Sequence, residues 1–104
     1  MAQNGCGALE PYALRVLGDS MEPEFPDGCV VIVDPGYGPR DGAYVVVEFA
    51  GDVFFRQLVF EGERRFLKAV NPAYGSFELT PPYTIRGAVV QKAGRRRSQR
   101  KHYA

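Results

Sequence analysis

The chain has 104 residues, an apolar fraction of 45% and a formal net charge of +1. This length suits one domain with a single core and is too short for a catalytic module joined to an independent binding domain. No apolar stretch approaches the roughly 20 residues needed to cross a bilayer, and no basic segment followed by an apolar one opens the sequence. We therefore expect a cytoplasmic protein that makes no contact with a membrane.

The charge is unevenly distributed along the sequence. Residues 92–104 contain six of the thirteen Lys and Arg and no acidic residue, which leaves seven basic against twelve acidic groups in residues 1–91, a net charge of −5. The sequence thus predicts an acidic body and a basic C-terminal tail over residues 93–104. Besides binding nucleic acid, such a tail can be a disordered, solubilising segment or dock on the acidic face of its own or a partner subunit.

Cysteine and histidine usage limits the chemistry. Cys6 and Cys29 are too few for a disulfide scaffold and form no short-spaced metal pattern, so we expect free thiols, no metal and no cofactor. The single histidine, His102, could serve a serine-histidine site only if the tail folded back over the body, and we do not expect such a triad.

The first half of the sequence predicts two strands separated by turns. Residues 1–12 show little periodicity and are expected to form a flexible leader. A strand is predicted in ALRVLG, residues 13–18. A turn-rich segment then leads to CVVIVDP, residues 29–35, a continuous apolar run that predicts a strand buried on both faces. The loop PGYGPRDG follows.

The second half predicts hairpins. AYVVVEF and DVFFRQLVF are separated by Ala50-Gly51, a spacing that favours a tight turn. The turn EGER then leads to RFLKAV, and NPAYG turns the backbone toward SFEL. After TPPY comes a last strand, TIRGAVVQK. Because no helical stripe exceeds a turn or two, we expect an all-β domain of six to eight strands over residues 13–92, folded as a coiled antiparallel sheet or small barrel.

The segment LRVLGDSMEPEFPDGCVVIVDP carries the candidate chemistry. Ser20 lies between a strand and a turn near Gly18, on backbone that can expose its hydroxyl and present N–H groups to a developing oxyanion. A Gly-x-Ser segment alone is equally typical of a turn or N-cap serine. The longer pattern is more specific: Gly-Asp-Ser-Met-x-Pro, then Gly28 opening an apolar strand that ends at Asp34-Pro35.

This longer pattern resembles the nucleophile segment of the C-terminal domains of LexA, UmuD and the phage lambda repressor, which are LexA-like serine peptidases with a signal-peptidase-like fold. The resemblance continues through GDVFFRQLVFEGERRFLKAVNPAYGSFEL and IRGAVVQK and covers residues 13–92. It implies the fold of that family, a homodimer and a serine-lysine dyad. In the family this dyad cleaves a peptide bond, usually in the protein's own linker after activation on a RecA filament.

Carried over residue by residue, the resemblance implies a set of roles. Ser20 takes the nucleophile position, and the backbone N–H groups of Asp19 and Ser20 are candidate oxyanion donors. Gly18 and Met21 would support the site, with Met21 packed beneath the turn. The family's general-base lysine falls on Arg56.

An arginine at this position changes the expected chemistry. A lysine base must be neutral, and lowering its pKa from about 10.4 to near 7 costs roughly 4 to 5 kcal/mol, which burial can impose. For arginine the drop is about six units or more, at least roughly 8 kcal/mol, comparable to the stability of a small domain. We expect Arg56 to stay charged, partly buried on the face of Phe54, Leu58 and Phe60, either paired with Asp19 or Glu22 or binding an anion.

Three functions remain open at this point. The first is a non-cleaving LexA-like domain that self-associates and binds a protein partner. The second is an active serine peptidase with an unusual base, for which Lys68 is the nearest candidate, although we expect Lys68 to be a surface lysine. The third is a nucleic-acid accessory protein that binds through residues 92–104, whose six cations would give a salt slope of at most about −5 on duplex DNA.

Two further expectations concern the segment before Ser20. Only nineteen residues precede it, so no helix-turn-helix domain is expected. Cys6-Gly7 matches a family cleavage dipeptide, but the leader would have to fold sharply back to reach Ser20, and we interpret the match as accidental.

Overall fold

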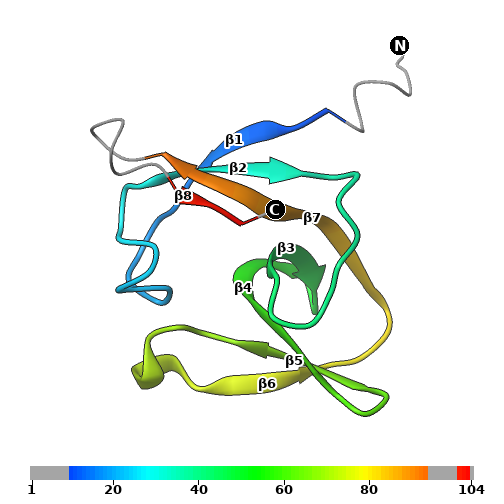
Figure 1. Ribbon diagram of the computed structural model, residues 1–104. Helices are drawn as coiled ribbons and strands as arrows, with labels where there is room; N and C mark the ends of the chain where they lie inside the picture. The colour runs from blue at the N-terminus through cyan, green and yellow to red at the C-terminus, as the bar shows by residue number, and fades with distance from the viewer. Residues whose placement is uncertain (1–9, 94–100, 104) are drawn as a thin grey trace.

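Eight strands form one antiparallel sheet in the computed structural model, which describes residues 10–93 and 101–103 (Figure 1). The strand order is β1-β2-β7-β3-β4-β5-β6, and β8 pairs with β7 off this path. The all-β fold predicted from the sequence is thereby confirmed. The strands are β1 Tyr12–Arg15, β2 Val30–Asp34, β3 Tyr44–Phe49, β4 Asp52–Glu61, β5 Arg64–Lys68, β6 Ser76–Leu79, β7 Tyr83–Ala93 and β8 Lys101–His102.

Both predicted hairpins are present. Ala50 and Gly51 join β3 to β4 with φ values of 54° and 85°, the left-handed conformations of a type I′ turn, whose twist matches that of the strands. Gly62 supplies the positive φ in the turn between β4 and β5. A short 3₁₀ helix, Pro72–Tyr74, links β5 to β6, and no helix among the described residues is long and apolar enough to span a membrane.

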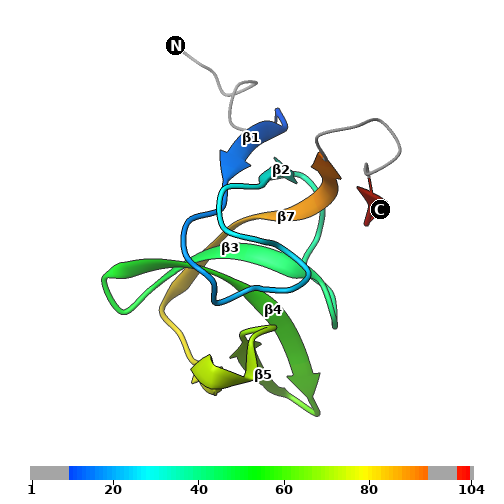
Figure 2. The same ribbon diagram turned by 90° about the vertical axis from the view of Figure 1, so that its left-hand side faces the viewer.

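Strand β7 is the centre of the sheet, because it pairs with β2, β3 and β8. It passes closest to β2 at Gly87, where an added Cβ would lie 2.6 Å from Val33 Cγ1 and 3.0 Å from the Asp34 carbonyl oxygen. Register shifts beside this point, in both the β2 and β3 ladders, coil the sheet. Figures 1 and 2 show the result, with β1 and β2 at one end and β5 at the other.

The coiled sheet encloses two apolar clusters. One lies beneath the segment that carries Ser20 and the other lies between β3, β4, β5 and β6. The buried members of the first are Val16, Met21, Phe25, Val31, Val33, Val46 and Val89, and those of the second are Val45, Val47, Leu58, Leu67, Leu79 and Ala88.

Strand β2 differs from its prediction. Val31 and Val33 are fully buried, but Val30, Ile32 and Asp34 are only half-buried. An antiparallel sheet commonly packs one face on the core and leaves the other toward solvent, so the continuous apolar run does not mean burial on both faces here.

The C-terminal segment returns to the body of the domain. Strand β7 continues to Ala93, and residues 101–102 return to pair with Gln91 and Lys92 (Figures 1 and 2). Tyr103 then packs against the first cluster. Residues 101–103 of the tail predicted over residues 93–104 therefore lie against the body, which is the docked alternative, while residues 94–100 lie outside the described residues.

Candidate functional site

The loop that carries Ser20 is closed at its base by backbone hydrogen bonds. The Val16 N–H donates to the Cys29 carbonyl at 2.8 Å, and the Gly28 N–H donates to the Val16 carbonyl at 2.7 Å. Gly18 has a φ of 87° and its N–H donates to Asp27 Oδ1 at 2.7 Å. A residue with a side chain would be strained at Gly18, which explains why glycine starts the turn.

Two buried side chains anchor this loop from below. Met21 and Phe25 both have no exposed surface, and the Phe25 N–H donates to the Met21 carbonyl at 2.8 Å. The Phe25 ring contacts Tyr44 and Phe55 edge-on, with centroids 4.8 and 5.0 Å apart. Met21 thus packs beneath the serine turn, as the resemblance implies.

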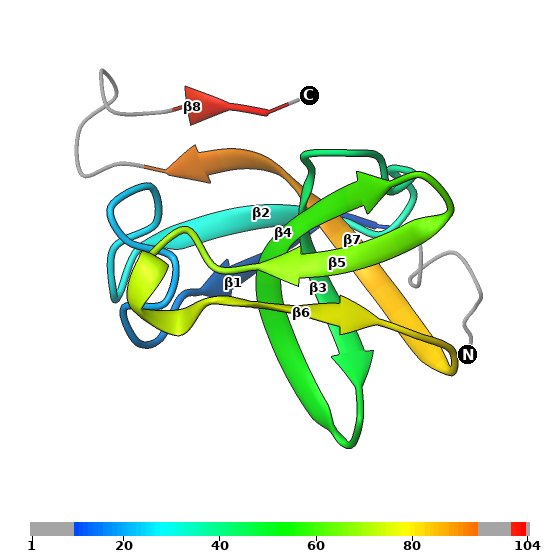
Figure 3. The same cartoon turned by 90° about the horizontal axis from the view of Figure 1, so that it is seen from below.

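A second turn braces the loop from the side. The Asn71 N–H donates to the Ser20 carbonyl at 2.9 Å, and Asn71 Nδ2 donates to the Asp19 carbonyl at 3.0 Å. The Tyr74 hydroxyl donates to the Asp19 carboxylate. Figures 1 and 3 show the 3₁₀ helix beside the loop that follows β1. Residues some fifty positions apart in sequence therefore fix the backbone on both sides of the serine hydroxyl.

Arg56 reaches the serine from the middle of β4. Its Nη1 donates to Ser20 Oγ at 3.1 Å and to the Phe55 carbonyl at 2.9 Å. Its Cζ lies 5.6 Å from the centroid of the Phe54 ring and 5.9 Å from that of Tyr74. The two positions that the resemblance assigns to the dyad are thus in direct contact.

The expected acidic partner of Arg56 is absent. No carboxylate in residues 10–93 or 101–103 forms an ion pair with this guanidinium, because Asp19 accepts from Tyr74 and Glu22 accepts from the Asp27 N–H at 3.3 Å. The prediction of a pair with Asp19 or Glu22 is wrong. Burial lowers the pKa of Arg56 from its ordinary value, and the nearby Tyr74 opposes that change.

The proposed oxyanion donors are available to a ligand. Neither the Asp19 N–H nor the Ser20 N–H donates to an acceptor within the described part of the protein, and the Ser20 hydroxyl hydrogen likewise has no acceptor there. Ser20 is half-buried and Asp19 is exposed. The turn can therefore present three hydrogen-bond donors outward.

Lys68 does not reach Ser20. It lies on β5 opposite Gln57, the residue after Arg56 on β4, so the side chains of Lys68 and Arg56 leave opposite faces of the sheet. Lys68 is also exposed to solvent. Its use as a base stays a prediction without a supporting contact.

The C-terminal end of the protein holds the underside of the loop. The Tyr103 ring packs on Phe25 and Tyr44, with both centroid separations 5.4 Å, and its hydroxyl donates to the Glu24 carboxylate. Lys92 Nζ donates to the Glu24 carbonyl at 2.7 Å and lies 3.7 Å from its carboxylate. Lys92 therefore makes its contacts within the domain. Of the six basic side chains counted in residues 92–104, five are left for the predicted tail.

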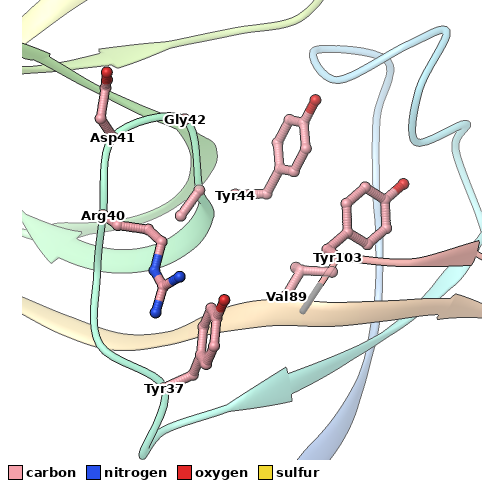
Figure 4. A pocket seen from close by; sticks show the side chains of 8 residues that line it. Tyr37, Arg40, Asp41, Gly42, Tyr44, Val89 and Tyr103 are labelled. Atoms are coloured by element: carbon pink, nitrogen blue, oxygen red, sulfur yellow. The ribbon is translucent and has the colours of Figure 1, made fainter.

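Tyr103 also lines a pocket of about 160 Å³ between the loop after β2 and the C-terminal segment (Figure 4). Arg40 stacks over the Tyr37 ring there, at 4.6 Å from Cζ to the centroid. The pocket contains no residue of the serine turn.

Three residues that matter for the site had no role in the sequence interpretation. The sequence predicts NPAYG only as a turn and gives Tyr103 no role. Their contacts join segments 52 to 79 residues apart, which local patterns do not encode. The Asn-Pro-x-Tyr spacing was the one available signal. Cys6-Gly7 lies outside the described residues.

Comparison with known proteins finds a family and several relatives for this chain. The family model described as peptidase S24-like matches residues 6–90. A transcriptional regulator of the HTH type for conjugative element R391, from Providencia rettgeri, is 38% identical over 97 residues, covering 86% of this chain and 43% of that protein. Repressor protein C2 of Salmonella phage P22 is 37% identical over 87 residues, covering 78% of this chain and 40% of that protein.

LexA repressor 2 of Pseudomonas syringae pv. tomato is 39% identical over 71 residues, covering 67% of this chain and 35% of that protein. The chain thus spans less than half the length of these relatives.

Proposed function

The chain belongs to the peptidase S24-like family, and from that membership we propose that it is a non-cleaving member that works by self-association and by binding a regulatory protein partner. This proposal assigns Ser20 to the ancestral nucleophile position and Arg56 to that of the general base. The family shares the fold, whereas peptide-bond cleavage depends on the side chain at position 56.

The direction of one hydrogen bond carries the proposal. Arg56 Nη1 donates to Ser20 Oγ, whereas a general base must accept the proton of the serine hydroxyl. A guanidinium has five N–H donors and no acceptor, and it keeps its charge in proteins. A cation beside Oγ would favour an alkoxide, but the proton still needs an acceptor, and none contacts Oγ among residues 10–93.

The names of the relatives support a regulatory role. They are transcriptional regulators and repressors, and this protein aligns with less than half of each. We propose that the domain supplies self-association, as a homodimer in the cytoplasm, to a regulator of this kind. Sedimentation equilibrium over micromolar to millimolar concentrations tests this, and a purely monomeric protein throughout that range contradicts it.

Cleavage assays test the catalytic part of the proposal. Wild type and Ser20→Ala are incubated between about pH 7 and pH 10, alone and with a pool of unstructured peptides, and products are read by mass spectrometry. We expect the two proteins to be equally inert. Wild-type cleavage that disappears in Ser20→Ala would contradict the proposal.

Two lysine variants then test whether Arg56 is the cause. Arg56→Lys restores a titratable amine in a partly buried position, so we expect slow, Ser20-dependent cleavage that increases with pH. Arg65→Lys is the matched control, because Arg65 is also half-buried, stacks on an aromatic ring and donates from Nη1 to carbonyl groups. Cleavage by the control but not by Arg56→Lys would place the chemistry elsewhere.

A further inference from the structure

Arg56 has an unused hydrogen-bonding edge. Its Nη1 is occupied by Ser20 Oγ and the Phe55 carbonyl, while Nε and Nη2 donate to no acceptor in the described ranges. These two atoms form the planar fork with which arginine binds carboxylates through two parallel bonds. The occupied Nη1 holds the guanidinium in place, so the fork is oriented before any ligand arrives.

Arg64 uses the same edge of its guanidinium to bind a carboxylate within this protein. Its Nε and Nη2 donate to the two carboxylate oxygens of Glu78 at 3.0 and 2.9 Å. Arg64 is exposed, whereas Arg56 is half-buried, so the charge of Arg56 loses more of its hydration. A partly desolvated guanidinium without a carboxylate gains more from binding an anion than an exposed one does.

Further donors lie in the adjoining turn. The hydroxyl of Ser20 and the backbone N–H groups of Asp19 and Ser20 lack acceptors among the described residues. The carboxylate of Asp19, in the same turn, accepts from the Tyr74 hydroxyl. Donors of one kind therefore gather around Ser20 Oγ without an opposing carboxylate in contact with Arg56.

We propose that the Ser20–Arg56 site binds the carboxylate of a peptide ligand, either the carboxyl terminus of the peptide or an Asp or Glu side chain within it. The inference rests on the proposed function, because it assigns the site to binding where cleavage is lost. The Arg56 fork holds the two carboxylate oxygens, and Ser20 Oγ, which contacts Nη1 on the opposite side of the guanidinium, holds the arginine in place.

Charge and surface chemistry favour this ligand over a phosphate polymer. One guanidinium balances one negative charge, and residues 1–91 carry a net charge of −5, which repels a polyanion. Two apolar side chains of the site are exposed: Leu17, at 78%, and Tyr74, at 52%. They offer contact surface to the neighbouring residues of a peptide, which a free anion lacks.

Titration of isotope-labelled full-length protein with acetylated tripeptides tests the proposal, read from the 15N–1H resonances of Arg56 Nε and the Ser20 amide. The probes are acetyl-Ala-Leu-Ala as the free acid, the same peptide as its C-terminal amide, and two amidated peptides with Glu or Gln at the centre. We expect saturable shifts with the free acid or with the Glu peptide, and affinity at least about tenfold weaker with the matching uncharged peptide. The acid that binds identifies the source of the carboxylate.

Three variants make the test specific. Arg56→Gln should weaken binding at least about tenfold, and Ser20→Ala should weaken it several-fold, because Nη1 loses one of the two acceptors that hold the guanidinium in place. Arg65→Gln is the control and should bind as wild type does. Thermal melting of each variant establishes that it is folded, and Ser20→Ala supplies the comparison should Arg56→Gln be unfolded.

The proposal is overturned if neither acid shifts the Arg56 Nε resonance, if both acids bind no better than their uncharged partners, or if inorganic phosphate binds and the carboxylates do not. Binding is measured by peptide titration and cleavage by product formation. Failure of this inference therefore leaves the non-cleaving function standing, and cleavage of the probes would instead contradict that function.

Discussion

Replacing Tyr103 with alanine should loosen the whole first cluster, although the residue is the second from the end of the sequence. Its ring contacts two aromatic rings at 5.4 Å, and its hydroxyl binds the carboxylate of Glu24 within the serine loop. Removing the side chain deletes these contacts together and leaves the segment held only by its backbone pairing with β7.

The magnitude follows from the contacts. Truncation of a fully buried aromatic residue costs about 3–5 kcal/mol, and Tyr103 is half-buried, so we expect a loss of about 2–3 kcal/mol for Tyr103→Ala. For a domain of this size that corresponds to a Tm lower by roughly 10–20 °C. Tyr103→Phe retains the ring and loses one bond to a charged acceptor, about 1 kcal/mol.

Urea unfolding followed by far-UV circular dichroism measures these values. The matched control is Tyr83→Ala, because Tyr83 is 37% exposed and has no aromatic partner among the described rings. We expect the control to cost less than about 1 kcal/mol. Equal stability of Tyr103→Ala and wild type would refute the view that the C-terminal segment is part of the domain.

Three further predictions concern stability. Burial and the Glu24 carboxylate raise the pKa of Tyr103, so the stabilising effect of its hydroxyl is complete below about pH 10 and declines at higher pH. The difference in unfolding free energy between wild type and Tyr103→Phe should therefore shrink by at most about 1.4 kcal/mol per pH unit. A constant difference in urea titrations at alkaline pH contradicts this. Gly87→Ala should lower the unfolding free energy by about 2–4 kcal/mol because the new Cβ meets β2, whereas Gly38→Ala, with open space around it, should change it by less than about 1 kcal/mol. Asn71→Ala should cost about 1–2 kcal/mol and speed hydrogen exchange in the serine loop, and unchanged exchange would show that Asn71 does not brace that loop.

The local signals in the sequence were sufficient for most of the fold. The two-residue spacing between β-forming runs predicted the Ala50-Gly51 turn, although Ala50 is not a residue that favours the positive φ that it adopts. The alternation in β4 placed Phe54, Leu58 and Phe60 on one face, and these residues pack in the second cluster. Such features depend on near neighbours in the sequence, which a pattern records directly.

The contacts between distant segments were beyond the sequence. The acidic partner expected for Arg56 was chosen by proximity, but Tyr74 had already engaged Asp19 from another turn. Lys92 was counted among the tail cations, yet it binds Glu24, 68 residues earlier. Hydrogen bonds of this kind depend on how the sheet coils, and the pattern of apolar residues along the sequence does not predict that coiling.

The most direct test of the central claim is the reaction of wild-type protein with a serine-directed fluorophosphonate, read by intact-protein mass spectrometry at neutral and mildly alkaline pH. If Arg56 holds Ser20 Oγ as a donor and no base accepts its proton, wild type should remain unlabelled, like Ser20→Ala. A stoichiometric adduct on wild type that is absent from Ser20→Ala would contradict the account, because it would show an activated serine beside a charged arginine.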